Sequence, residues 1–166
     1  MVKKKPALKR IERFLLENRN INSVATAQNY PILEKLGIDM RVFSKLGNAD
    51  YRVSWTSYSS KKMFFLIRDN YGEKDQVFTS QAHYLIKIFS DSIMVFHQEQ
   101  LRKHLEKNWD KFPVVYSERH SSSGVLVDVE ELEREVATYE ELPFSPYKQK
   151  GLNNKIALLP SVKLSS

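Results

Sequence analysis

The segment MFFLIRD, residues 63–69, is the feature that most limits how this chain can fold. An uninterrupted apolar run of this length predicts a central strand buried on both faces, which requires a packed layer on each side. The preceding stretch YRVSWTSY alternates Tyr51, Val53 and Trp55 with polar residues, which predicts a strand with one buried face. The polar turn SSKK between the two stretches would join them as a hairpin.

Helical spacing appears on both sides of these strands. Leu8, Ile11 and Leu15 predict an amphipathic helix over residues 6–19, with Pro6 in its first turn. Further helices are predicted over residues 25–37, 98–109 and 128–141, the last with Asp128 and Glu131 in a capping-box pattern. Further strands are predicted over residues 83–89, 93–96, 113–116 and 125–129.

This order of elements predicts an α+β or α/β fold, with a single mixed β-sheet of four to five strands flanked by helices. Residues 1–142 would form one domain. Residues 143–166 hold three of the six prolines, so we expect an extended C-terminal arm there.

Charge is distributed unevenly along the chain, whose net charge is +6. Residues 1–68 hold 14 Lys and Arg against 5 Asp and Glu, whereas residues 69–166 hold 12 against 15. Such asymmetry indicates a polyanion partner for the basic half, and nucleic acid is the first candidate. A solvated basic face without a partner and an acidic protein partner are the alternatives.

Several classes of function are disfavoured. The chain has no cysteine, which excludes disulfides, thiolate metal sites and a cysteine nucleophile. It contains neither GxxxxGK[ST] nor GxGxxG and has only five glycines, so nucleotide hydrolysis and dinucleotide chemistry are not expected. No apolar run reaches the roughly 20 residues that span a bilayer. We therefore expect a cytoplasmic protein without a membrane partner.

The order of helix, strand meander, helix and strand over residues 6–137 resembles the core of the PD-(D/E)XK, or restriction-endonuclease-like, nucleases. That family binds one or two Mg²⁺ ions with an acid near the start of one core strand and a Glu/Asp-x-Lys motif on the next. The resemblance implies that Asp50 is the first acid. Leu66, Ile67 and Arg68 occupy the motif positions, so the motif is not intact. Leucine cannot bind a hard cation, and arginine stays protonated and cannot act as a base.

Our first hypothesis is a nucleic-acid-binding protein that contacts phosphates on a restriction-endonuclease-like scaffold, as an accessory protein of a phage or plasmid would. Binding of this kind depends on charge and needs no metal. The basic N-terminal helix and the hairpin would supply the contacts: Lys9, Arg10, Arg13, Arg52, Lys61, Lys62 and Arg68. Trp55, Tyr51 and Tyr58 lie among these cations and could stack on bases.

The second hypothesis is a divergent Mg²⁺-dependent endonuclease, and whether the chain is an enzyme stays open. Its catalytic residues would be Asp50, Asp69, Glu73 and Lys62, with Lys87 as another candidate lysine, and its metal ligands Asp50, Asp69 and Asp75. The simpler interpretation is that Asp50 begins a strand and Asp69 ends one. A third hypothesis is a protein-interaction module or inhibitor that acts through the acidic helix 128–141 or the C-terminal tail.

Overall fold

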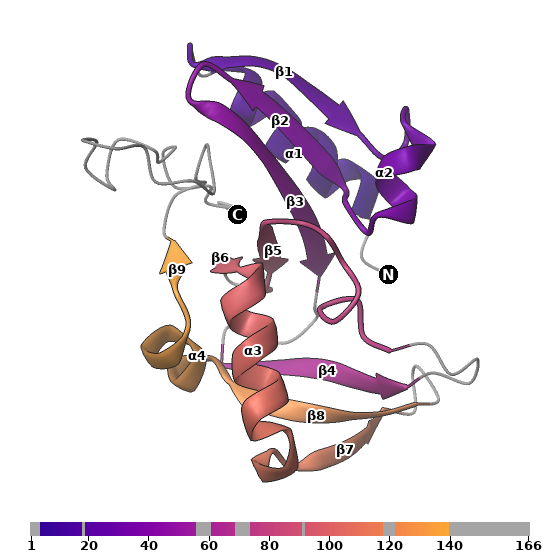
Figure 1. The fold of residues 1–166 in the computed structure, drawn as a ribbon, viewed down its shortest axis with the longest axis vertical. Coiled ribbons are helices and arrows are strands. Elements are labelled where there is room, and N and C mark those ends of the chain that lie inside the picture. Colours follow the sequence, from indigo (N-terminus) through magenta and orange to yellow (C-terminus); the bar gives the residue numbers. More distant parts are fainter. Residues whose placement is uncertain are drawn as a thin grey trace.

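The protein has an α+β fold, as its sequence predicts, with two β-sheets and helices packed against them (Figure 1). The structure is a computed structural model, and it describes residues 4–17, 19–55, 61–68, 74–90, 92–117 and 122–139. The helices are α1 (Lys4–Leu16), α2 (Pro31–Lys35), α3 (Gln98–Asn108), the 3-10 turn η1 (Trp109–Lys111) and α4 (Val129–Glu135). The strands are β1 (Ile21–Thr26), β2 (Met40–Ser44), β3 (Gly47–Trp55), β4 (Lys62–Arg68), β5 (Tyr84–Ile88), β6 (Ile93–His97), β7 (Val114–Ser117), β8 (Ser122–Asp128) and β9 (Thr138–Tyr139).

The larger sheet is mixed, with the strand order β1-β2-β3-β5-β6-β9. Its neighbouring strands are antiparallel except for β3 and β5, which run parallel. Five of its strands have five or more residues, and β9 adds only two. The predicted mixed sheet is therefore present. The predicted arm over residues 143–166 lies outside the described residues.

A second, smaller sheet has the order β4-β8-β7, so the prediction of a single sheet is wrong. β3 and β4 are consecutive in sequence but do not form the predicted hairpin. β3 pairs with β2 and β5, whereas β4 pairs with β8. The chain therefore belongs to the larger sheet at β3 and to the smaller sheet at β4 (Figure 1).

Two hydrophobic cores lie on opposite faces of the larger sheet. β5 contributes to both because successive side chains of a strand point to opposite faces. Tyr84, Ile86 and Ile88 join the first core, which α1 closes with Ile11 and Leu15. The second core lies between the other face, the smaller sheet, α3 and α4, and includes the following buried residues: Leu85, Phe96, Leu101, Leu105, Met63, Phe65, Val125, Val127 and Leu132.

The apolar run in β4 is not a central strand, because β4 lies at the edge of the smaller sheet. Met63 and Phe65 are buried, whereas Phe64 and Leu66 are half-buried. Phe64 instead covers the neighbouring strand at Gly124, where a Cβ would approach its ring to less than 3.0 Å. The second face of β4 is therefore sheltered in part by its own side chains, with Phe64 lying over Gly124 of β8, and is not buried as that of a central strand would be.

The elements around β1 and α4 also differ from the prediction. The segment predicted as a helix over residues 25–37 contains the end of β1 and only the short helix α2, while β1 and β2 were not predicted. β1 is an edge strand whose sequence, INSVAT, is half polar and does not alternate regularly, which hides its strand character. α4 ends at Glu135, and Asp128 makes no side-chain capping hydrogen bond, so the predicted capping box is absent.

Candidate functional site

Asp50, the acid singled out from the sequence, lies on β3 and is 7% exposed. Its carboxylate oxygens accept hydrogen bonds from Arg41 of β2, at 2.7 Å from Nε and 3.1 Å from Nη2. This hydrogen bonding raises the pKa of Arg41. The backbone N–H of Asp50 donates to Nδ1 of His83 at 2.9 Å. Asp50 of β3 is therefore connected to β2 through its carboxylate and to His83, the residue before β5, through its backbone.

The remaining predicted acids are only partly described. Asp69 and Glu73 lie outside the described residues. Asp75 accepts backbone hydrogen bonds from Leu66 at 2.8 Å and Val77 at 2.9 Å, and so ties its loop to β4. Within the part of the chain that the structure describes, no three His, Asp or Glu side chains are grouped so that they could hold a metal ion. The predicted Mg²⁺ site stays a prediction.

Several predicted basic residues already have acidic partners. Arg52 of β3 lies 3.3 Å from Asp39, which also accepts a hydrogen bond from the backbone of Val53 at 2.7 Å. Lys62 begins β4 and pairs with Asp128, and Lys61 beside it is exposed. The side chains of Arg68 and Trp55, and all of Tyr58, lie outside the described residues.

The outer side of α1 is basic and solvent-exposed. Lys9, Arg10 and Arg13 are exposed, while Ile11 and Leu15 on the opposite side are 1% and 0% exposed. Helical periodicity separates the two sets, since residues three and four apart share a face. The buried side anchors the helix on the larger sheet and keeps the three cations on one outward surface.

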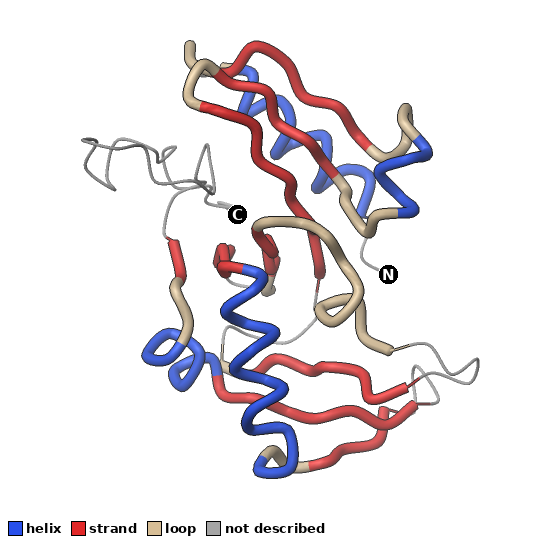
Figure 2. The backbone as a smooth tube through the Cα atoms, viewed as in Figure 1, coloured by secondary structure: helices blue, strands red, loops and turns tan. Residues whose placement is uncertain are grey.

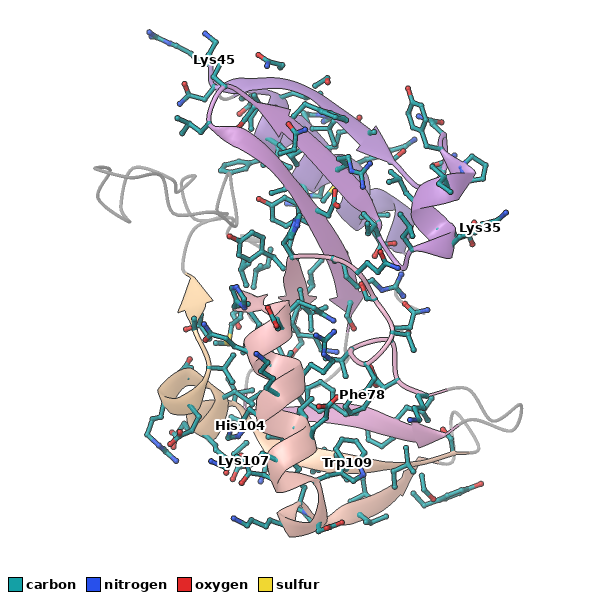
Figure 3. All side chains as sticks on the ribbon, viewed as in Figure 1. Lys35, Lys45, Phe78, His104, Lys107 and Trp109 are labelled. Carbon is teal, nitrogen blue, oxygen red and sulfur yellow. The ribbon has the colours of Figure 1, made fainter. Side chains whose placement is uncertain are left out.

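Two further exposed cations lie near the C-terminal end of α1. Arg19 follows the helix, and Lys45 occupies the turn between β2 and β3. The backbone N–H of Lys45 donates to Asn20 at 2.9 Å, which brings this turn next to the end of α1. Figure 3 shows Lys45 at the tip of the turn, pointing away from the body of the protein. We call Lys9, Arg10, Arg13, Arg19 and Lys45 the α1 basic surface.

The α1 basic surface is separate from Lys61 and Lys62. α1 packs on the larger sheet, whereas β4 belongs to the smaller sheet at the other end of the protein (Figure 1). The predicted common surface of helix and hairpin is thus divided between two parts of the fold. Arg52 is divided from α1 as well, because its neighbours Tyr51 and Val53 face the α1 core and Arg52 faces the other way.

A cavity of about 290 Å³ opens on that other face of the larger sheet. It lies between β3, β4, β5 and the loop over residues 74–83. Figure 2 shows this loop in tan, leading to β5. Phe78 of this loop meets Trp109 edge to face, with ring centroids 5.2 Å apart (Figure 3). The cavity's polar lining residues are Arg52, Ser54, Lys74, Asp75, Gln76, Lys87 and Gln98.

Lys87 is the most unusual residue in this cavity. It is 6% exposed, and its ammonium donates to Oγ of Ser54 at 3.0 Å. Burial lowers the pKa of Lys87 from 10.5 to about 8, although the nearby charge of Asp75 acts in the opposite direction. Gln98, from the first turn of α3, also lines the cavity and is 1% exposed.

Sequence reasoning named Lys87 only as an alternative lysine and did not find Ser54 or Gln98. The available signal was a lysine in the middle of the apolar strand YLIKI. Parallel pairing then places Ser54 opposite Lys87, a relationship that requires the strand register.

A second cavity, of about 490 Å³, has two histidines in its lining, His83 and His97. The ring of Tyr84 is 6.5 Å from that of His83 and 6.0 Å from that of His97. Burial lowers the pKa of both histidines. Nδ1 of His97 accepts a hydrogen bond from the backbone of Gln100, so His97 caps α3. Each histidine therefore has a structural role: His83 accepts the backbone hydrogen bond of Asp50, and His97 caps α3.

Comparison with protein-family models, curated proteins and solved structures gave no match to this chain. None of the described helices is both long and apolar enough to cross a membrane. The function therefore has to be argued from the surfaces and cavities themselves.

Proposed function

We propose that this protein binds nucleic acid, DNA or RNA, by contacting phosphates with the α1 basic surface. The observation that supports this most directly is the arrangement of Lys9, Arg10 and Arg13 on one exposed side of α1. Because Ile11 and Leu15 anchor the other side in the core, the three charges are held on a stable support. Arg19 and Lys45 extend the positive surface beyond the end of the helix.

Phosphate contacts of this kind supply affinity without reading sequence. An exposed acid just after α1, Glu17, adds one negative charge near the α1 basic surface, but the cations are in excess. Residues 69–166 carry more acids than bases. This charge imbalance along the chain favours one orientation of the protein on nucleic acid, with the α1 basic surface toward the phosphates. Lys62 and Arg52 are paired with acids, so we assign them a smaller part than the α1 residues.

The proposal does not require the PD-(D/E)XK resemblance or a metal ion. A divergent Mg²⁺-dependent nuclease remains an alternative that the same experiment tests. Docking of another protein on α4 or the C-terminal tail is not favoured by any contact of the described residues.

The test is a binding assay with labelled single- and double-stranded DNA and RNA, in EDTA and in Mg²⁺. Three phosphate contacts on duplex DNA predict a roughly 40-fold loss of affinity when salt rises from about 50 to about 200 mM. The variant Lys9→Gln/Arg10→Gln/Arg13→Gln should lose this salt-dependent binding. The matched control Lys103→Gln/Lys107→Gln/Lys111→Gln removes three exposed charges from the other end of the protein and should retain it.

The outcomes separate the hypotheses. Salt-sensitive binding in EDTA that depends on the α1 charges supports the proposal. Equal loss in both variants would mean that only net charge matters, and no binding at low salt would refute the proposal. Cleavage that appears only with Mg²⁺ would favour the nuclease alternative.

A further inference from the structure

We propose that the cavity around Lys87 binds a small organic anion whose carboxylate or phosphate group pairs with the Lys87 ammonium and whose N–H or O–H group donates to Gln98. This site is distinct from the α1 basic surface, which lies on the other face of the larger sheet. The inference does not rest on the proposed nucleic-acid binding.

The first argument is the unbalanced charge of Lys87. Its only polar contact among the described residues is the hydroxyl of Ser54, a neutral group. None of the ion pairs between described residues includes Lys87. A buried ammonium is costly unless an opposite charge and hydrogen bonds compensate it. An anion in the cavity would supply that charge.

The second argument is the buried amide of Gln98. Its Nε2 donates to the backbone oxygen of Val77 at 3.0 Å. Its Oε1 is buried and has no hydrogen-bond partner among the described residues. Buried polar atoms are satisfied in the great majority of cases, and an exception in a cavity points to a missing donor. A ligand that carries an N–H or O–H group would provide it.

The third argument is the composition of the cavity wall. Small-molecule sites combine an apolar lining with a few convergent polar groups. Here β4, β5 and the loop contribute the apolar part of the wall: Met63, Phe64, Phe65, Leu66, Val77 and Leu85. The volume of about 290 Å³ suits a compact molecule with one ring or a short chain. The ligand therefore has an apolar body as well as an anionic group.

The surrounding charges favour an anion over a cation. β3 contributes Arg52, which is paired with Asp39, and the loop contributes Lys74 and Asp75. Both carboxylate oxygens of Asp75 already accept backbone hydrogen bonds. β4 and α3 contribute no described charged side chain to the lining, so the free charges of Lys74 and Lys87 exceed that of Asp75.

The experiment uses benzoate and phenyl phosphate as probes of the anionic group, with benzamide as the uncharged counterpart of benzoate. A third anion, 3-(hydroxymethyl)benzoate, adds an O–H donor for Gln98 and should bind more tightly than benzoate. Binding is followed by NMR through the Lys87 side-chain signal in protein with ¹³C-labelled lysine. Benzoate stays ionised above neutral pH, while Lys87 loses its proton near pH 8. Benzoate affinity should therefore fall about tenfold between pH 7 and pH 9. Benzamide should not bind.

Two variants complete the test. Lys87→Met keeps an unbranched side chain one atom shorter, removes the charge and should abolish binding of both anions. Lys103→Met removes an exposed lysine of α3 that does not line the cavity, and it should leave anion binding unchanged. Lys9→Gln/Arg10→Gln/Arg13→Gln should also leave it unchanged, so failure of this inference and failure of the nucleic-acid proposal can be told apart.

Three results would each overturn the inference. One is the absence of a saturable Lys87 shift with either anion at concentrations of about 50 mM, a level far above ordinary ligand affinities. Another is equal binding of benzamide and benzoate. The third is benzoate affinity that does not change between pH 7 and pH 9 in the wild-type protein, a measurement that does not depend on any variant folding.

Discussion

Arg41 and Asp50 face each other across β2 and β3, and the guanidinium holds both carboxylate oxygens at 2.7 and 3.1 Å. Two parallel hydrogen bonds of this kind are stronger and more directional than one. The side chain of Asp50 is 11% exposed and that of Arg41 is 35% exposed. The carboxylate of the pair is therefore well shielded from solvent, while the guanidinium is partly exposed. The acid that resembles a nuclease ligand is thus a structural partner of a specific arginine.

We expect Asp50→Asn to lower the free energy of unfolding by about 1.5–3 kcal/mol, because the substitution removes the charge that the arginine binds. Urea unfolding at pH 7 measures the change. Asp110→Asn, at an exposed position, is the control and should change little. In Arg41→Met/Asp50→Asn the loss should be smaller than the sum of the single losses, since the two side chains interact directly. Additive losses would contradict the pairing.

Gly124 lies where the ring of Phe64 crosses from β4 to β8. A Cβ at this position would meet two ring atoms of Phe64 and the backbone oxygen of Phe65. Gly124→Ala should therefore lower the free energy of unfolding by about 1–3 kcal/mol, the usual cost of overpacking. Chemical denaturation gives the value, with Ser123→Ala on the opposite face of β8 as control.

A second substitution separates the two sources of strain. Phe64→Leu/Gly124→Ala should recover part of the stability if the ring is the main obstacle. Recovery is expected to be incomplete, because the backbone oxygen of Phe65 remains. A Gly124→Ala protein as stable as the wild type would contradict the expected overpacking and show that β4 and β8 can move apart at little cost in free energy.

The parts of the fold that the sequence predicts well are local. The hairpin of β5 and β6 joins two apolar stretches through a short polar turn, and Leu101 and Leu105 of α3 recur at helical spacing with Trp109, which begins η1. Both patterns depend on residues close together in the chain. Burial confirms them, since Leu101 and Leu105 are both 0% exposed.

The sheet partners are not local, and sequence reasoning missed them. The continuous run in β4 was assigned to a central strand because all its residues are apolar, but pairing with β8 places it at an edge. The half-buried face of β4 is apolar because it adjoins the cavity and Gly124. The hydrophobic periodicity of the sequence does not distinguish a central strand from an edge strand whose apolar face adjoins a cavity.

In the candidate site, too, single residues can be predicted from the local sequence, whereas their partners cannot. Asp50 stands out in the sequence as an acid ahead of an alternating stretch, but it lies inside β3 and does not begin it, and its partner Arg41 lies on a strand that was not predicted. Lys87 stands out as a charge within an apolar strand. Its relation to Ser54 and Gln98 depends on parallel pairing and on the packing of α3, which only the fold supplies.

Lys87 should make stability depend on alkaline pH. Its pKa is about 8 in the folded protein against a usual value of 10.5. Between these values the unfolded chain binds more protons, so the free energy of unfolding rises as pH increases from about 8 to 10.5. Each pKa unit corresponds to about 1.4 kcal/mol, so the full rise is about 3 kcal/mol.

The variant Lys87→Met should be more stable than the wild type at pH 7, because it removes a buried charge without leaving a carboxylate unpaired. The difference should shrink as pH rises above 8. Urea unfolding of both proteins at several pH values measures it, and Lys103→Met serves as an exposed control. A Lys87→Met protein that is less stable at pH 7 would mean that the ammonium is already compensated in the folded state.

His83 should make stability depend on pH in the acidic range, with the same sign as Lys87: the free energy of unfolding rises with pH. Burial lowers its pKa below 6.5, with opposing influences from Asp50 on one side and Arg41 and His97 on the other. Below pH 6.5 the unfolded chain therefore binds more protons at this position, and stability falls as pH decreases. Because His83 is only half-buried, we expect the effect to be smaller than that of the buried Lys87.

The variant His83→Asn tests this assignment, since the asparagine oxygen can accept the backbone hydrogen bond of Asp50 that Nδ1 accepts in the wild type. Stability at pH 7 should be almost unchanged, and the loss between pH 7 and pH 5 should be smaller. Burial lowers the pKa of His97 as well, so His83→Asn/His97→Asn should flatten the profile further. Thermal unfolding across this range measures both variants. A profile as steep as that of the wild type in the double variant would place the acid sensitivity in other groups.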